Sequence, residues 1–381
     1  MGNIIIYVHD LRSSGVVRDA MMLADHCAGR HDTTLVAGHG EGFFREAAGQ
    51  GRYRLAILKD RPSPAASRIT AAQPLRRWLR GQPPGVLLSM GNHGHATAYL
   101  ACRGLGHVGR VYRISNEVTR GDGLRGALRM HWMERLIADA ARIAIVGATL
   151  RRAPMLARAI ERGHAVEIPS GVDVDQARAL ALAPSPHPWF DEDVPVVLGI
   201  GRLRPQKNFA LLIEAVGAAR AERRLRLAIL GSGSGSGSGD ERARLEDCAA
   251  RAGLGEDFLL AGESANVFAW AARAGVFVLP SRWEGSSVAL LEAMAVGAPV
   301  IASRRAGDAA QVLDEGRHGL LVGGEDRSEL ARAILVQLSG YAVRPGDRAC
   351  AYGLPGGTYL DLVEAVMAEM AEMDGPARAA A

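Results

Sequence analysis

The sequence predicts an α/β protein of two domains, each built on a doubly wound parallel sheet. Three observations support this: a length of 381 residues, short apolar runs that alternate with helix-period segments, and a proline-rich break within that alternation. A chain of this length exceeds one ordinary core and suits two domains of roughly 150–200 residues each. Apolar runs that alternate with helical segments are typical of βαβ units in parallel sheets.

The first half contains seven apolar runs that we expect to be strands: Ile4–Val8, Thr34–Ala37, Leu55–Leu58, Val86–Ser89, Val111–Ile114, Ile143–Val146 and Ala165–Ile168. The break follows at residues 183–189 and is rich in proline, which stops both helices and strand ladders. We therefore expect an N-terminal Rossmann-like domain over residues 1–182 and a linker over residues 183–195.

The second half resumes the alternation in a domain expected over residues 196–345. Its expected strands are Val196–Ile200, Arg226–Leu230, Phe258–Leu260, Val276–Leu279, Pro299–Ala302 and Gly319–Val322. A last helix, expected over residues 358–374, begins with a capping signal and carries one apolar face, so we expect it to pack near the first domain. Residues 375–381 are expected to form a disordered tail.

Composition and charge narrow the class of protein. The four cysteines show neither CxxC pairs nor metal-ligand spacing, so we expect no disulfide framework, no zinc site and a reduced cytosolic setting. The chain shows no basic leader with a cleavage site, and no apolar run approaches the ~20 residues of a membrane span. Residues 1–170 hold 24 Lys and Arg against 13 Asp and Glu, whereas residues 171–381 hold 21 against 28. The basic first half suggests an acidic lipid surface, a phosphorylated acceptor or nucleic acid as a partner, although a plain arginine-rich surface would look the same.

The segment Gly201–Asn208 directly follows an expected strand and carries Arg202 and Lys207. It therefore lies at the carboxyl edge of a sheet, where open α/β sheets bind ligands. A guanidinium and an ammonium at this spacing can hold a diphosphate and neutralise its charge as it leaves. On an isolated loop, the same two residues would usually be solvated.

The segment Pro280–Pro299 holds Glu284 before a Gly-Ser-Ser turn and Glu292 inside the helix that follows. A glycosidase needs two carboxylates only ~5–9.5 Å apart, and the helical rise carries Glu292 well away from Glu284. This spacing better fits two separate tasks, one on a sugar and one on a ribose. The four backbone N–H groups at the start of this helix predict a binding site for a phosphate. They belong to Gly285, Ser286, Ser287 and Val288.

Taken in order, these segments resemble glycosyltransferase family 4, a group of retaining enzymes with the GT-B fold. The resemblance is carried by Gly201–Lys207, by a glycine loop at Gly231–Gly239, and by a Glu-x7-Glu element within Pro280–Ala302. It covers the second half and, more loosely, the first. It implies two Rossmann-like doubly wound domains that face each other across a cleft, with the donor site in the second.

The resemblance implies a role for each matching position. Arg202 and Lys207 would bind the donor diphosphate and stabilise its charge. Glu284 would bind the donor sugar near the reaction centre, and Glu292 would bind the ribose.

Other donor contacts are implied more loosely. Gly262 lies in the strand-end segment where the family holds the base, and Gly15 lies in the first βα loop, which approaches the donor phosphates. Two positions depart from the family pattern: Asp308 and Gln311 replace its second glycine and its glutamate. We expect these departures to affect donor choice.

The acceptor side is less defined. Ser115 and Asn116 stand where many family members carry a histidine, so we assign no catalytic base and keep Asn116 as a candidate acceptor contact. His93 and His95, in a glycine-rich loop, could also contact the acceptor, although histidines in such loops are more often plain surface residues.

The resemblance implies a metal-independent hexosyltransferase that retains configuration and moves a sugar from a UDP- or GDP-sugar to a glycan, lipid-linked or small-molecule acceptor. The setting would be polysaccharide or glycolipid biosynthesis. The nucleotide sugar is a substrate, so no cofactor and no metal are expected. The enzyme would act through positioning and electrostatics, and the leaving diphosphate would help to deprotonate the acceptor. A sugar-nucleotide epimerase and a non-catalytic nucleotide-sugar-binding subunit are the alternatives.

Two basic segments of the first half, Leu75–Arg80 and Gly123–Arg142, also carry tryptophan and leucine. Such segments can rest on an anionic membrane surface with tryptophan facing the lipid, although ordinary core-facing helices show the same pattern. We expect a cytoplasmic protein, peripheral on the inner face of the plasma membrane, with no nucleic-acid partner.

Overall fold

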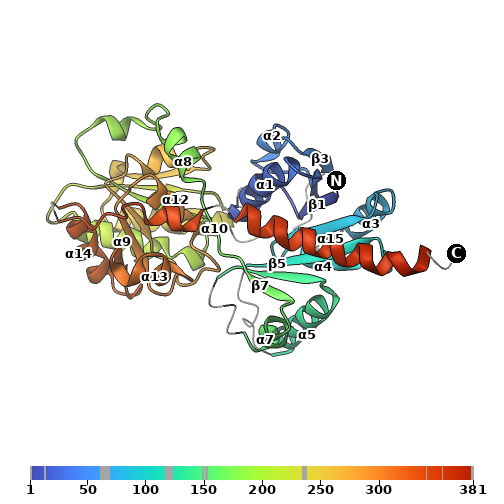
Figure 1. Ribbon diagram of the computed structural model, residues 1–381. Helices are drawn as coiled ribbons and strands as arrows, with labels where there is room; N and C mark the ends of the chain where they lie inside the picture. Colours follow the sequence, from blue (N-terminus) through green and yellow to red (C-terminus); the bar gives the residue numbers. More distant parts are fainter. Residues whose placement is uncertain are drawn as a thin grey trace. The chain divides into compact units, whose positions relative to one another are not determined.

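The computed structural model describes residues 2–12, 14–60, 69–115, 123–147, 150, 153–233, 238–339, 341–353 and 355–378. The chain forms two compact units, one of Met1–Pro169 with Pro355–Ala381 and one of Ser170–Leu354 (Figure 1). Each unit contains one parallel sheet, and every strand expected from the sequence is present, with differences only at the strand ends. The predicted α/β class with two parallel-sheet domains is confirmed.

The first unit has a seven-stranded sheet in the order β3-β2-β1-β4-β5-β6-β7. Its strands are β1 (Asn3–Val8), β2 (Asp32–Ala37), β3 (Arg54–Ile57), β4 (Gly85–Met90), β5 (Val108–Ile114), β6 (Arg142–Ile145) and β7 (Ala165–Glu167). The central strand β1 is buried along its whole length. Burial on both faces explains why it appears in the sequence as an uninterrupted apolar run.

Helices cover both faces of this sheet, because successive residues of a strand point to opposite sides. Ile4 and Ile6 of β1 pack with one layer of helices, whereas Ile5 and Tyr7 pack with the other. The first layer contains α1 (Gly15–Ala28), the short α2 (Arg45–Ala48) and α15 (Gly356–Arg378). The second layer contains α3 (Ala72–Arg80), α4 (His95–Cys102), α5 (Gly123–Asp139) and α7 (Pro154–Glu161).

Helix α15 completes the core of the first unit although it comes last in the chain. It packs on α1 and over strands β4, β5 and β6, and it buries Leu360, Val363 and Val366. The last helix is therefore part of the first unit, where we expected it. It extends to Arg378, four residues beyond the expected end at residue 374, and the disordered tail over residues 375–381 stays a prediction.

A buried polar cluster joins α15 to the rest of the first unit. The Nε of Arg113, in β5, donates to the hydroxyl of Tyr359 in α15 at 2.9 Å, and its Nη2 pairs with Asp19 of α1 at 2.6 Å. Burial opposes the charge on Arg113, but Tyr359 and Asp19 outweigh it and raise the pKa of the guanidinium. Three elements thus meet at one buried cation.

The second unit has a six-stranded sheet in the order β10-β9-β8-β11-β12-β13. Its strands are β8 (Val196–Ile200), β9 (Arg226–Leu230), β10 (Phe258–Gly262), β11 (Val276–Leu279), β12 (Val300–Ser303) and β13 (Leu320–Val322). One face packs against α9 (Phe209–Ala219), α10 (Ser238–Arg251) and α14 (Arg327–Gln337). The other packs against α8 (Val174–Ala181), α11 (Val267–Ala271), α12 (Val288–Ala295) and α13 (Ala309–Val312). This sheet is also doubly wound.

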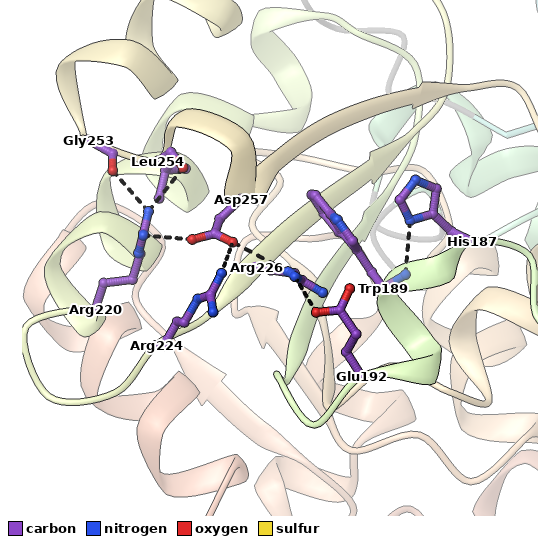
Figure 2. A network of polar contacts seen from close by, with 9 residues as sticks. All are labelled: His187, Trp189, Glu192, Arg220, Arg224, Arg226, Gly253, Leu254 and Asp257. Atoms are coloured by element: carbon purple, nitrogen blue, oxygen red, sulfur yellow. Dashed lines mark hydrogen bonds and ion pairs between the residues drawn. The ribbon is translucent and has the colours of Figure 1, made fainter.

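The segment expected to be a linker is bound to the second unit, as Figure 2 shows. The ring of Trp189 lies 5.1 Å from the guanidinium of Arg226, and Glu192 pairs with the same arginine at 2.7 Å. Arg226 also contacts Asp257, which accepts hydrogen bonds from Arg220 and Arg224 as well. These contacts fix the segment at the amino ends of β9 and β10.

The boundary between the units therefore differs from the sequence prediction. The chain enters the second unit after residue 169, not after residue 182. The physical reason is α8, whose apolar residues pack on α11 and α12 of the second unit. Proline density marks the segment that follows α8 and does not mark the boundary itself.

Candidate active site

The loops after β8, β9 and β10 meet at the carboxyl edge of the second sheet. The N–H of Gly201 donates to the carbonyl of Leu230 at 2.9 Å, and the N–H of Gly231 donates to that of Gly262 at 2.6 Å. A Cβ at Gly231 would lie 2.0 Å from the carbonyl oxygen of Gly201, so this approach requires glycine. Gly262 thus lies beside the start of the Gly-Ser loop, of which residues 234–237 are outside the described residues.

Lys207 and Glu284 are in direct contact. Lys207 ends a short turn, Pro205–Lys207, and its Nζ lies 2.5 Å from Oε1 of Glu284. The hydroxyl of Ser281 donates to the same oxygen at 2.6 Å. The two charged side chains are only 15% and 10% exposed, so water screens their charges weakly. Two residues 77 positions apart in the chain therefore share one site.

Gln206 connects the two segments that carry this pair. Its side-chain amide donates to the backbone carbonyl of Trp283 at 2.8 Å. Its backbone carbonyl accepts a hydrogen bond from the backbone N–H of Arg282 at 2.9 Å. Sequence reasoning does not single out Gln206, although its place directly before Lys207 is a signal for it. Arg202, the other cation predicted to hold the diphosphate, lies exposed in the same loop.

The start of α12 holds a carboxylate from the protein itself. The N–H of Ser287 donates to Oδ1 of Asp308 at 2.9 Å, and the hydroxyl of Ser286 donates to Oδ2 at 3.3 Å. Burial raises the pKa of Asp308, while these hydrogen bonds act in the opposite direction. Sequence reasoning expects the first amides of this helix to receive a phosphate, and it misses that the amide of Ser287 is bonded internally. The replacement of a glycine by Asp308 is the signal that points to this contact.

The loop that carries Asp308 also touches Glu284. Gly307 adopts a left-handed φ of 61°, and a Cβ there would lie 2.9 Å from the carbonyl oxygen of Glu284. Glu292, in contrast, lies farther along α12 and is buried, with 4% exposure. Glu284, the start of α12 and Asp308 therefore form one cluster at this edge of the second unit.

The candidates in the first unit come from separate segments of the chain. Gly15 begins α1, where the hydroxyl oxygen of Ser14 accepts the N–H of Val17 at 3.2 Å and caps the helix. His93 is exposed in the loop after β4. Asn116 lies outside the described residues.

His95 belongs to the core of the first unit. Its Nε2 donates to the carbonyl of Arg113 at 3.1 Å, and this assignment leaves Nδ1 to accept the hydroxyl of Ser89 at 2.9 Å. Burial lowers the pKa of the imidazole to about 4. Because both ring nitrogens are bonded inside the unit, the structure removes His95 from the candidate acceptor contacts.

Comparison with known proteins places the site in a recognised sequence context. Residues 194–339 match the family model described as Glycosyl transferases group 1. Over 103 residues the chain is 33% identical to the lipopolysaccharide core biosynthesis mannosyltransferase LpsB of Rhizobium meliloti, a match that covers 27% of this chain and 29% of that protein. Over 234 residues it is 31% identical to the D-inositol 3-phosphate glycosyltransferase of Geodermatophilus obscurus, covering 58% of this chain and 50% of that protein. The matches thus span half or less of the length of these relatives.

Solved structures resemble the whole chain. A glycosyltransferase from Rickettsia africae ESF-5 has a TM-score of 0.74 at 14% identity and covers 96% of this chain and 98% of that one. Anabaena Alr3699/HepE, in complex with UDP and glucose, has a TM-score of 0.74 at 16% identity, with coverage of 99% and 100%. The α,α-trehalose 6-phosphate synthase of Burkholderia multivorans has a TM-score of 0.77 at 17% identity, with coverage of 97% and 100%. The chain therefore has the GT-B fold, and its second unit carries the sequence features of group 1 glycosyl transferases.

Proposed function

We propose that this chain is a retaining, metal-independent glycosyltransferase that transfers a hexose from a UDP- or GDP-sugar to a glycan or lipid-linked acceptor in polysaccharide or glycolipid biosynthesis. The observation that carries the proposal is the Lys207–Glu284 pair at the carboxyl edge of the second sheet, inside the segment that matches the family model. The ammonium can bind a diphosphate, and the carboxylate can accept hydrogen bonds from sugar hydroxyls. The UDP and glucose held by HepE support a nucleotide sugar as the donor.

The choice of lysine at position 207 adds to this support. The chain has 45 basic residues, and Lys59 and Lys207 are its two lysines; all the others are arginine. The side chain of Lys207 passes close to Gly201, where a Cβ would lie 2.8 Å from Cε. An ammonium is a compact charge on a flexible stem, whereas a guanidinium is a broad planar fork. One of only two lysines among the 45 basic residues thus supplies the compact cation at this narrow position.

In the proposed reaction, the bond between the anomeric carbon and the diphosphate oxygen breaks while the acceptor oxygen attacks from the same face. The departing diphosphate takes the acceptor proton, and Lys207, Arg202 and the start of α12 stabilise its growing charge. Catalysis then rests on positioning and on charges fixed before the reaction.

The two lysines permit a test that needs no acceptor. An amine-reactive label, read by peptide mass spectrometry, should modify Lys207 less when UDP or GDP is present, while labelling of Lys59 stays unchanged. Equal labelling of Lys207 with and without nucleotide would contradict the proposal.

Transfer itself is tested with radiolabelled UDP- and GDP-hexoses and a cell-envelope extract as the source of acceptor. Lys207→Arg should lower the transfer rate by about 100-fold, the scale of losing one preorganised charge donor. Lys59→Arg is the matched control and should keep wild-type activity. Release of an epimeric nucleotide sugar without acceptor would instead identify an epimerase.

We also propose that the second helix layer of the first unit rests on an anionic membrane surface. Among the residues whose burial the structure describes, its helices and the turns that follow them expose more basic than acidic side chains: Arg77, Arg80, Arg103, Arg135, Arg158 and Arg162 against Glu134 and Glu161. The tryptophans are less available than the sequence suggests, because Trp132 packs edge-to-face on Tyr99 at 5.8 Å and Trp78 packs against the core. Attraction would therefore come mainly from arginine.

Liposome flotation tests this surface. The protein should float with vesicles that contain acidic lipid and remain in the bottom fraction with neutral vesicles. Salt at 0.5 M should release it from the acidic vesicles, because it screens the charges. Equal flotation with both vesicle types would contradict the proposal. In the part of the chain that the structure describes, no helix is long and apolar enough to cross a bilayer.

A further inference from the structure

The loop at Ala306–Asp308 is bonded to the start of α12 through three contacts. Two oxygens of the Asp308 carboxylate accept hydrogen bonds from the Ser287 amide and the Ser286 hydroxyl. The hydroxyl of Ser287 in turn donates to the carbonyl of Ala306 at 2.8 Å. The carboxylate therefore sits at the positive end of the helix, in the position that suits any anion.

The same loop reaches the residue proposed to bind the donor sugar. Gly307 lies against the backbone of Glu284, closer than a residue with a side chain could come. Glu284 is paired with Lys207, so the charge of this cation is already matched by one carboxylate. Asp308 adds a second negative charge to the region that a donor diphosphate must enter.

From this placement we propose that Asp308 is an internal competitor for the donor phosphate, and that the donor must displace its carboxylate from the Ser287 amide in order to bind. The inference rests on the proposed function, because it takes the start of α12 as the phosphate position. A carboxylate and a phosphate cannot share one amide, and their like charges repel at contact distance. The departing nucleoside diphosphate meets the same repulsion, so Asp308 weakens donor binding and favours product release.

A purely structural role for Asp308 makes a different prediction. As a helix cap alone, it would stabilise the start of α12 without opposing the ligand, and an amide could replace the carboxylate as the hydrogen-bond acceptor. Ligand affinity would then be the same in the wild type and in Asp308→Asn. The test must therefore remove the charge of Asp308 while keeping the shape of its side chain.

The test is isothermal titration calorimetry of the full chain with UDP and GDP. Asp308→Asn should bind the preferred nucleotide roughly fivefold more tightly or better, the effect of removing one like charge at contact distance even under water-like screening. Asp308→Gly, which empties the position, should tighten binding at least as much. Uridine or guanosine, which lack phosphate, should bind all proteins equally.

Asp314→Asn is the matched control, because it removes the same charge from an exposed carboxylate that pairs with Arg317 at 3.0 Å in the same segment. It should bind UDP and GDP as the wild type does. If the wild type binds a nucleoside diphosphate and Asp308→Asn does not bind it more tightly, the inference is overturned and the proposed function stands. If no protein in the series binds either nucleotide, both are overturned.

Discussion

His95 provides a prediction whose size follows from the structure. The imidazole is 1% exposed, both nitrogens are hydrogen-bonded, and burial lowers its pKa to about 4. In the unfolded chain, the imidazole of His95 should titrate near the ordinary histidine pKa of about 6.5. Between pH 7.5 and pH 5.0 the unfolded state therefore takes up a proton that the folded state does not. The first unit should lose about 2 kcal/mol of unfolding free energy over this interval through this residue alone.

The sign follows from the direction of the shift. A histidine whose folded pKa is lowered contributes its full stability above the unfolded pKa and loses it as the pH falls toward the folded value. Urea unfolding at the two pH values, read by hydrogen exchange of peptides from β4 and β5, isolates the first unit. His95→Gln should reduce the pH dependence of its unfolding free energy by about 2 kcal/mol, whatever its absolute stability.

The control is His164→Gln, because His164 is exposed in the turn before β7. This variant should keep the pH dependence of the wild type. The reasoning is refuted if His95→Gln shows the same loss between pH 7.5 and pH 5.0 as the wild type, since the buried imidazole would then titrate as it does in the unfolded chain.

Two further substitutions test single contacts. Gly307→Ala places a Cβ 2.9 Å from the carbonyl oxygen of Glu284, so kcat/KM for transfer should fall. Gly346→Ala is the control, because Gly346 also has a left-handed φ, of 55°, but no atom lies near its Cβ. It should show the same backbone strain of about 1–2 kcal/mol and keep full activity. Thermal melts and initial rates of both variants check this, and equal activity would contradict it. Tyr359→Phe removes the acceptor of the buried Nε of Arg113 and should lower the stability of the first unit by about 1–3 kcal/mol. Calorimetry measures this cost, and an unchanged first transition would show that the bond contributes nothing.

The fold could be predicted from the sequence because buried parallel strands leave a continuous apolar signature. Val196–Ile200 and Arg226–Leu230 form strands with the same ends that the apolar runs indicate. The unit boundary could not be predicted in this way, because it depends on where α8 packs and not on where prolines occur. The helical end of α15 was missed for a similar reason, since its polar, proline-containing composition resembles a tail.

The candidate site also contains contacts that the sequence predicts and contacts that depend on tertiary packing. Motif order and resemblance bring Lys207 and Glu284 to one edge, and the structure places them in contact. The contact between Ser287 and Asp308 is tertiary, between residues 21 positions apart, and only the missing glycine hints at it. His95 shows the converse limit, because a glycine-rich context suggests a surface loop while the side chain is buried.

The place of α15 in the first unit sets an order for folding during synthesis. The second unit is one continuous stretch of chain, whereas the first unit needs the segment that follows it. The first unit is translated earlier, yet Leu360, Val363 and Val366 of α15 reach its core only after the second unit has been translated. Until then the sheet face under α15 is uncovered and open to chaperones or to self-association. The first unit, although its translation begins first, therefore cannot be completed before the whole second unit has been translated.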